Sequence, residues 1–302
     1  MNDKPIKKLK AIPSIFVVCA VLLLGINGCE PQKENITNGN SASSNLKIIS
    51  LVPNVTEILF ELGFGGNIIG FSKHCNYPIK PPKDKVMGDY FSFDVEKIII
   101  SNPDVIFYRK SAGDMLGTRI REVKGNSIKI IAVPTAQTLK ETYSEIMMIA
   151  RQLNCVKKAE KLVRKMKRQI SKMKPFEKGY EPKIYIEVDT RFAAGENSFL
   201  GDIALMAGAK TNIIGKLAGR NGYQAVSEIS KLPTVILKLH PGKLGFEQNF
   251  SSGIKDASIT VIEPKGETLD MINRDGPRIV KAVIWLRNAM ENRMENDYQA
   301  VK

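Results

Sequence analysis

The sequence predicts an α/β protein of two Rossmann-like lobes with central parallel sheets, joined by one long α-helix, with a ligand cleft between the lobes. Short apolar runs of strand type alternate with helical segments in both halves of the 302-residue chain, as in parallel sheets covered by helices. Between the halves, residues 139–173 contain no glycine or proline and repeat apolar residues at helical spacing. A helix of about 35 residues is roughly 50 Å long, enough to cross between two lobes.

A weak internal echo supports the division into two similar halves. Val95-Glu96-Lys97-Ile98, followed by Pro103 and an apolar run, is echoed by Ser227-Glu228-Ile229, followed by Pro233 and an apolar run. One supersecondary unit carried twice predicts two related lobes with a cleft between them.

The first lobe opens with the apolar segment 47–51, a buried strand that Pro53 stops. Asn54 and Glu57 form a capping-box pattern, which predicts a helix that ends at Gly63. Further strands are expected at 68–71, 105–108 and 128–133, with helical segments between them.

The connecting helix begins near Leu139 and ends before Pro175, and its pattern allows a break near Asn154. Two packed helices of a bundle are the alternative interpretation. In the second lobe we expect strands at 184–188, 235–239 and 259–262, a helix at 199–206 closed by Gly208, and a last amphipathic helix from Pro277 to about residue 294.

The N-terminus carries an export signal. Lysines at positions 4, 7, 8 and 10 precede an apolar run from Ile15 to Gly25, and the sequence Ile26-Asn27-Gly28-Cys29 follows. This ending is similar to the lipobox of bacterial lipoproteins, which implies that Cys29 is acylated and becomes the first residue of the mature chain. An uncleaved transmembrane anchor is the alternative, but the run is shorter than the roughly 20 residues that a spanning helix needs.

The expected organisation follows from these segments: signal peptide 1–28, flexible tether 29–45, N-terminal lobe 46–136, linker helix 137–175 and C-terminal lobe 176–302. The tether is rich in Asn, Ser and Gly and poor in apolar residues. In the folded body only Cys75 and Cys155 remain. They could form one disulfide in an oxidising compartment, but we expect separate buried thiols.

Composition excludes several classes of protein. A hydrophobic fraction of 43% with 25% charged residues is that of a soluble globular protein rather than a disordered or membrane-embedded one. The formal net charge is +14, but the basic residues are spread over helices instead of forming one tract. We therefore interpret the charge as solvated faces attracted to anionic lipid headgroups, and we expect no nucleic-acid partner.

Catalytic and metal-binding patterns are absent from the sequence. His74 and His240 are the only histidines, and neither has a metal-ligand spacing to another histidine or to a cysteine pair. The chain has no Gly-x-Ser-x-Gly elbow and no Walker loop. We expect no enzyme, no metal site and no resident cofactor.

Several ordered segments resemble ABC-importer substrate-binding proteins with a helical interdomain linker, the group that serves cobalamin, haem and iron–siderophore uptake. The matching segments are residues 48–59 (IISLVPNVTEIL), 70–78 (GFSKHCNYP), 94–98 with 102–106, 194–199 (AGENSF) and 276–280 (GPRIV). The Cys-Asn-Tyr-Pro segment, Cys75–Pro78, is most similar to the cobalamin-binding branch.

The resemblance implies roles for individual residues. Glu96 and Glu228 stand where the family places one acidic residue per lobe to dock into arginine pockets of the permease. The implied ligand-binding residues are His74, Tyr90, Tyr108, Phe192, Tyr223 and Arg274. An imidazole at His74 could coordinate the central metal of a chelate through an axial position; the alternative is a histidine that packs at the cleft wall.

Together these features predict a lipid-anchored, extracytoplasmic protein, either periplasmic or on the outer face of the cell membrane. Its expected task is to deliver cobalamin or a related corrinoid to an ABC importer, with a permease dimer as its partner. The expected protein is a monomer. A ferric siderophore or haem is the alternative ligand, and an exported enzyme is a remote alternative.

Overall fold

The computed structural model describes residues 45–89, 92–110, 115–124, 127–177, 180–215, 222–225, 232–245 and 259–300. The signal segment, the tether up to residue 44, Cys29, Tyr90 and Glu228 lie outside these residues. The described residues all belong to one compact unit, Asn40–Lys302. Within the described part of the chain, no helix is both long enough and apolar enough to cross a membrane.

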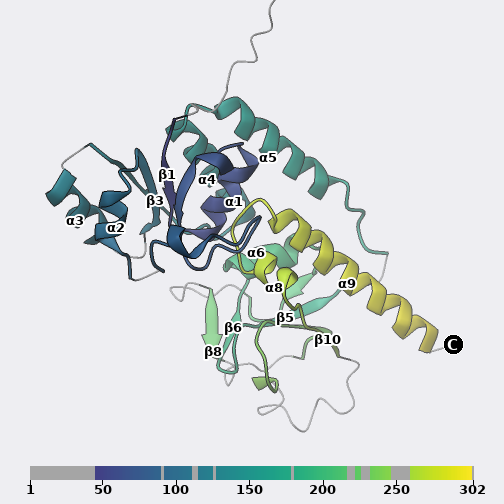
Figure 1. The fold of residues 1–302 in the computed structure, drawn as a ribbon. Coiled ribbons are helices and arrows are strands. Elements are labelled where there is room, and N and C mark those ends of the chain that lie inside the picture. The colour runs from purple at the N-terminus through teal and green to yellow at the C-terminus, as the bar shows by residue number, and fades with distance from the viewer. Residues whose placement is uncertain are drawn as a thin grey trace, which may run out of the picture. The chain divides into compact units, whose positions relative to one another are not determined.

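The first sheet is parallel, as predicted. Its strands β1 (Ile48–Ser50), β2 (Ile68–Phe71), β3 (Val105–Arg109) and β4 (Lys129–Val133) lie in the order β2-β1-β3-β4. Helices α1 (Pro53–Glu61), α2 (Val95–Ile100) and α3 (Met115–Lys124) and the short 3-10 turns η1 (Gly65–Asn67) and η2 (Lys83–Lys85) connect them (Figure 1).

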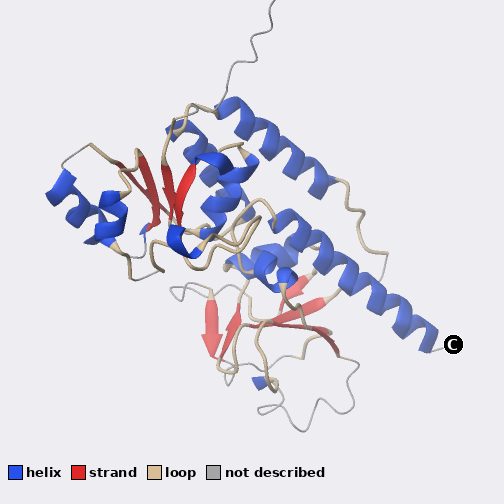
Figure 2. Cartoon of the chain, in the orientation of Figure 1, coloured by secondary structure: helices blue, strands red, loops and turns tan. Residues whose placement is uncertain are grey.

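The second sheet is mixed. Strands β5 (Lys183–Glu187), β6 (Phe192–Ala194), β8 (Tyr223–Ala225), β9 (Val235–Lys238) and β10 (Thr260–Ile262) follow the order β10-β9-β5-β6-β8, and β7 (Thr211–Asn212) pairs with β5 (Figure 2). Strands β10, β9, β5 and β7 are parallel, as expected, and antiparallel pairs extend the sheet at one edge. β6 runs antiparallel to β5 because a short turn joins the two strands and returns the chain beside its own strand. β8 in turn pairs antiparallel with β6. Asp189 stabilises this turn by accepting bonds from the amides of Arg191 and Phe192.

The predicted linker consists of two helices, α4 (Leu139–Gln152) and α5 (Val156–Ser171), instead of one. Asn154 lies between them with a φ of 53°. Asparagine tolerates this left-handed conformation better than most residues, and a helix cannot continue through it. The break falls at the position that the sequence allowed, and α4 packs against α5.

The remaining helices of the second half are α6 (Phe199–Met206), α8 (Glu267–Ile272) and α9 (Ile279–Ala300). α6 has the predicted bounds: the Ser198 hydroxyl caps it by accepting a bond from Gly201 N, and Gly208 follows its end with a φ of 102°. α6 packs against α9, and α5 also packs against α9.

Alternating side chains of β1 enter two apolar clusters, as expected for a strand covered on both faces. Ile48 belongs to a large cluster that continues through Ile149 of α4 and Ile184 of β5 to Val283 of α9. Ile49 belongs to a smaller cluster on the other face of the first sheet. One continuous core therefore connects the two sheets. Cys75 and Cys155 are buried, unpaired thiols, as expected.

The capping-box prediction for α1 is wrong. Val52 occupies the N-cap position without a side-chain cap bond, and Pro53 begins the helix, where a missing amide hydrogen costs nothing. Asn54 and Glu57 are instead buried and contact residues far away in the sequence.

Candidate functional site

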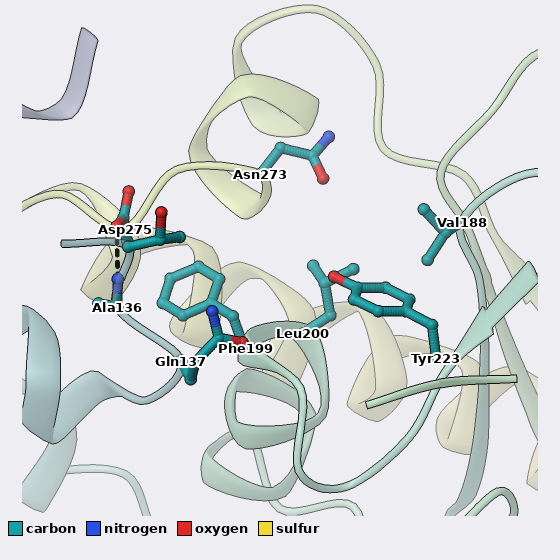
Figure 3. Close-up of a pocket in the computed structure, with 9 residues that line it drawn as sticks. Ala136, Gln137, Val188, Phe199, Leu200, Tyr223, Asn273 and Asp275 are labelled. Carbon is teal, nitrogen blue, oxygen red and sulfur yellow. Dashed lines mark hydrogen bonds between the residues drawn. The ribbon is translucent and has the colours of Figure 1, made fainter. Parts of the chain in front are cut away.

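A cavity of about 380 Å³ opens between loops of the two halves. The first half contributes the segment between β4 and α4, and the second half contributes the residue after β5, the start of α6, β8 and the loop between α8 and α9. The lining residues are Thr135, Ala136, Gln137, Val188, Phe199, Leu200, Tyr223, Asn273 and Asp275 (Figure 3). Both β4 and β5 end at this cavity, so it occupies the carboxyl edge of parallel strands, where α/β proteins bind ligands.

The described lining combines apolar surface with uncharged hydrogen-bonding groups. Val188, Phe199 and Leu200 supply the apolar contact area, whereas Gln137 and Asn273 supply amides. Burial raises the pKa of Tyr223, so its phenol is neutral and can donate a hydrogen bond. Among the described lining residues, Asp275 carries the one carboxyl group, and none is Lys, Arg or His.

Asp275 is already engaged inside the protein. Its Oδ2 accepts a bond from Ala136 N at 3.0 Å (Figure 3), and Arg109 donates to Oδ2 and Oδ1, both at 3.3 Å. Arg109 also donates to the Pro134 carbonyl at 2.6 Å and to Asn54 Oδ1 at 2.7 Å. The carboxylate therefore fixes the loop of the second half against the first half instead of standing free in the cavity.

Glu145 of α4 completes this cluster. Asn54 Nδ2 donates to Glu145 Oε1 at 2.7 Å. Burial raises the pKa of Glu145 to about 8, and the neighbouring Asp275 carboxylate adds to the rise, while Arg109 opposes it. Near pH 7 Glu145 is therefore protonated, which leaves Asp275 as the counter-charge of Arg109.

A second buried ionic cluster joins α1 to the same loop. Glu57, which is 2% exposed, accepts bonds from Arg278 Nε at 3.0 Å and Nη2 at 2.7 Å, and from Arg274 Nη1 at 3.2 Å. The Arg278 guanidinium also lies 3.9 Å from the centre of the Tyr77 ring. Residues 274–278 thus tie the second half to the first through two opposite pairs of charges, Glu57 with the arginines and Arg109 with Asp275.

The structure brings only part of the predicted ligand set to the cavity. Tyr223 lines it. Tyr108 is 4% exposed and packs in the smaller apolar cluster of the first half, and Phe192 is 43% exposed on β6. The half-buried His74 follows β2, and its carbonyl accepts a bond from Arg274 Nη2 at 3.3 Å.

Arg274 is held by protein groups: besides Glu57 and the His74 carbonyl, it donates to Asn76 Oδ1 at 2.6 Å and lies 3.5 Å from Asp270. Glu96 is exposed on α2 and is not among the described residues that line the cavity, as expected of a docking residue. The ligand-binding and docking roles of these residues stay predictions.

Sequence reasoning missed Thr135, Gln137, Asn273 and Asp275. Thr135 and Gln137 follow a predicted parallel strand, and the rule that ligands bind at carboxyl edges could have selected them. Asn273 and Asp275 belong to a loop whose position depends on packing between the halves, so no local pattern marks them.

The chain is similar to known binding proteins. The family model described as "Periplasmic binding protein" matches residues 48–224. YvrC, an ABC transporter substrate-binding lipoprotein of Bacillus subtilis, is 24% identical in an alignment that covers 92% of this chain and 95% of the relative. A vitamin B12-binding protein of Pectobacterium carotovorum is 21% identical over 78% of this chain and 85% of the relative.

Solved structures show the same fold. A possible iron-binding, periplasmic solute-binding protein of Staphylococcus epidermidis superposes with a TM-score of 0.64 at 24% identity, covering 82% of this chain and 99% of that chain. The periplasmic haem-binding protein HutB of Vibrio cholerae superposes with a TM-score of 0.63 at 16% identity, covering 81% and 98%. At these identities the likeness is one of fold.

Proposed function

The chain belongs to the periplasmic binding protein family, and from this premise we propose that it binds cobalamin or a related corrinoid and delivers it to an ABC importer. The named relatives are binding proteins of transporters rather than enzymes. We extend that role to this chain and propose that it is a monomer that catalyses no reaction and holds no resident metal or cofactor.

The chemistry of the cavity lining is the observation that carries the choice of ligand. Its described side chains offer amides, hydroxyls and apolar surface, with no cationic group. A corrinoid with a periphery of neutral amides matches this lining, because amides can both donate to and accept from Gln137, Asn273 and Tyr223. Haem carries two carboxylates, and burying them without a cationic partner is unfavourable.

Size sets how much of the ligand this lining can hold. A corrinoid is larger than the cavity of about 380 Å³, so one part of the ligand would lie in it and the rest would extend beyond the described lining. Specificity would then arise where the ligand edge meets the polar loops of both halves.

Delivery requires a surface separate from the cavity. Glu96 is exposed near the N-terminus of α2, and Ile100, one helical turn further along, is 82% exposed. A carboxylate beside an exposed apolar side chain suits a reversible contact with guanidinium groups of a permease. Glu228 is the proposed counterpart in the second half and lies outside the described residues.

Anchoring to the membrane is proposed from the N-terminal sequence and from the lipoprotein name of the Bacillus subtilis relative. Acylation at Cys29 would place the folded unit outside the cytoplasm on a flexible tether. Mass spectrometry of the membrane-extracted protein should find a lipidated Cys29 at the N-terminus, and Cys29→Ala should retain the signal peptide. Recovery of wild-type protein with an unmodified Cys29 would contradict this assignment.

A ligand panel tests the choice of ligand. Purified protein from residue 30 onward is mixed with cyanocobalamin, haemin or ferric siderophores, and the thermal midpoint and ligand absorbance are recorded. We expect cyanocobalamin to raise the midpoint, because a ligand that binds only the native state stabilises it. A rise with haemin or a siderophore alone would reject the corrinoid and favour an iron-chelate binding protein.

A further inference from the structure

The segment Thr135–Leu139, which connects β4 to α4, forms one wall of the cavity. Thr135, Ala136 and Gln137 line the cavity, and Leu139 is the first residue of α4. We propose that Asp202 and Asp275, two carboxylates of the second half, are positioning residues that hold this wall in its ligand-binding place. The proposal rests on the proposed function, because it assumes that the ligand binds in this cavity.

Both carboxylates accept bonds from backbone amides of the wall. Asp275 Oδ2 accepts from Ala136 N at 3.0 Å, and Asp202 Oδ2 accepts from Leu139 N at 2.7 Å. Asp202 lies on α6 and Asp275 in the loop after α8, so two separate elements of the second half hold the wall. The bonds involve charged acceptors, which makes them stronger than bonds between neutral groups.

A third carboxylate, from α4 itself, also accepts a bond from the wall and can be compared with the two carboxylates of the second half. Glu141 of α4 accepts a bond from Gln137 N at 2.7 Å, and its own amide donates to the Thr138 hydroxyl at 3.1 Å. Glu141 moves with α4 and therefore shapes the wall without fixing it to the second half. All three carboxylates also lie near the positive end of α4, where negative charge is favourable.

Two consequences follow for ligand binding. The wall is ordered before the ligand arrives, so binding does not bear the entropic cost of ordering it. The amides of Ala136, Gln137 and Leu139 are already occupied by carboxylates, so they are not available to an anionic group of the ligand. At these three positions the wall therefore presents side chains rather than backbone donors to the ligand.

Asp202 gives the cleaner test, because Asp275 itself lines the cavity and Asp202 does not. Asp202→Ala removes the acceptor, Asp202→Asn keeps an oxygen in its place, and Glu141→Ala removes the local bond as a matched control. Hydrogen exchange of a peptide spanning residues 136–143 is measured on the ligand-free protein. Cyanocobalamin affinity is measured by calorimetry.

We expect Asp202→Ala to speed exchange in the wall and to weaken cyanocobalamin binding roughly tenfold, the effect of losing one bond to a charged group. Asp202→Asn should give an exchange rate and a cyanocobalamin affinity between those of Asp202→Ala and the wild type. This variant still tests the proposal if Asp202→Ala folds poorly. Glu141→Ala should speed exchange while changing affinity less than threefold, because the bonds of Ala136 N and Leu139 N to the second half stay in place.

If exchange of the wall peptide were unchanged in Asp202→Ala, Asp202 would not hold the wall. If exchange were faster but the cyanocobalamin affinity unchanged, Asp202 would have no positioning role in ligand binding. If wild-type protein bound no corrinoid, the proposed function would fail, whereas the exchange measurement would still decide whether Asp202 holds the wall.

Discussion

Replacing Glu57 with alanine removes the carboxylate that the buried Arg278 and the partly buried Arg274 share. Arg278 loses bonds of 3.0 and 2.7 Å to Glu57, and Arg274 loses one of 3.2 Å. Arg278 is 5% exposed, so water cannot replace the lost partner. Removing one member of such a buried pair costs about 3–5 kcal/mol when the other charge stays desolvated. Glu267 still lies 3.2 Å from Arg278 Nη1, but its side chain is 65% exposed, so it offsets only part of this cost.

Urea unfolding followed by circular dichroism measures this loss, with Glu61→Ala as the control. Glu61 is exposed, one helical turn further along α1, and its replacement should change the free energy of unfolding by about 0.5 kcal/mol or less. For a folded unit of this size we expect Glu57→Ala to lower the thermal midpoint by roughly 6–20 °C. Adding Arg278→Met to Glu57→Ala should recover part of the loss, because it removes the stranded charge.

The reasoning is refuted if Glu57→Ala costs no more than Glu61→Ala. It is also refuted if the second substitution, Arg278→Met, only adds to the loss, because the energy would then come from packing and not from an unpaired charge.

Three further predictions concern protonation, docking and motion. Since the pKa of Glu145 is raised from 4.5 to about 8, the folded state keeps a proton that the unfolded chain releases, and this contribution to stability is lost as pH rises through about 8. Glu145→Gln should therefore be more stable than wild type at about pH 9 and equal to it near pH 4; equal stability at both values would reject a protonated Glu145. Glu96→Ala should impair uptake in cells and leave ligand affinity in solution unchanged, and weakened binding would place Glu96 in the cleft. Because the ionic ties of residues 274–278 join both halves, small-angle scattering should give nearly equal radii of gyration with and without ligand, whereas a contraction of several ångströms would indicate hinge closure.

Much of the fold could be predicted because its signals are local. The helix at 199–206 was predicted with its correct bounds, since Ser198 and Gly208 mark its two ends within ten residues of each other. The strand at 68–71 was equally clear from its apolar run. The sequence allowed a break near Asn154, where the structure has it. The hairpin that makes β6 antiparallel depends on a short turn, and periodicity describes such turns poorly.

The site was harder to predict because its contacts are distant in sequence. Asn54 and Glu57 match a local capping pattern, yet their partners Glu145 and Arg278 lie 91 and 221 positions away. Among the described residues that the resemblance predicted to face the ligand, Tyr223 is the one that lines the cavity. The amides of Gln137 and Asn273 and the carboxylate of Asp275 come together only when the two halves pack, so their spacing in the sequence does not predict it.

Hydrogen exchange with and without cyanocobalamin tests the central claim most directly, because it reports both whether this ligand binds and where. We predict slower exchange in peptides that cover residues 135–139 and 273–275, which line the cavity from opposite halves. Peptides of α2, which carries Glu96, should be unaffected. No protection by cyanocobalamin, or protection by haemin alone in the same peptides, would contradict the assignment of a corrinoid to this cavity.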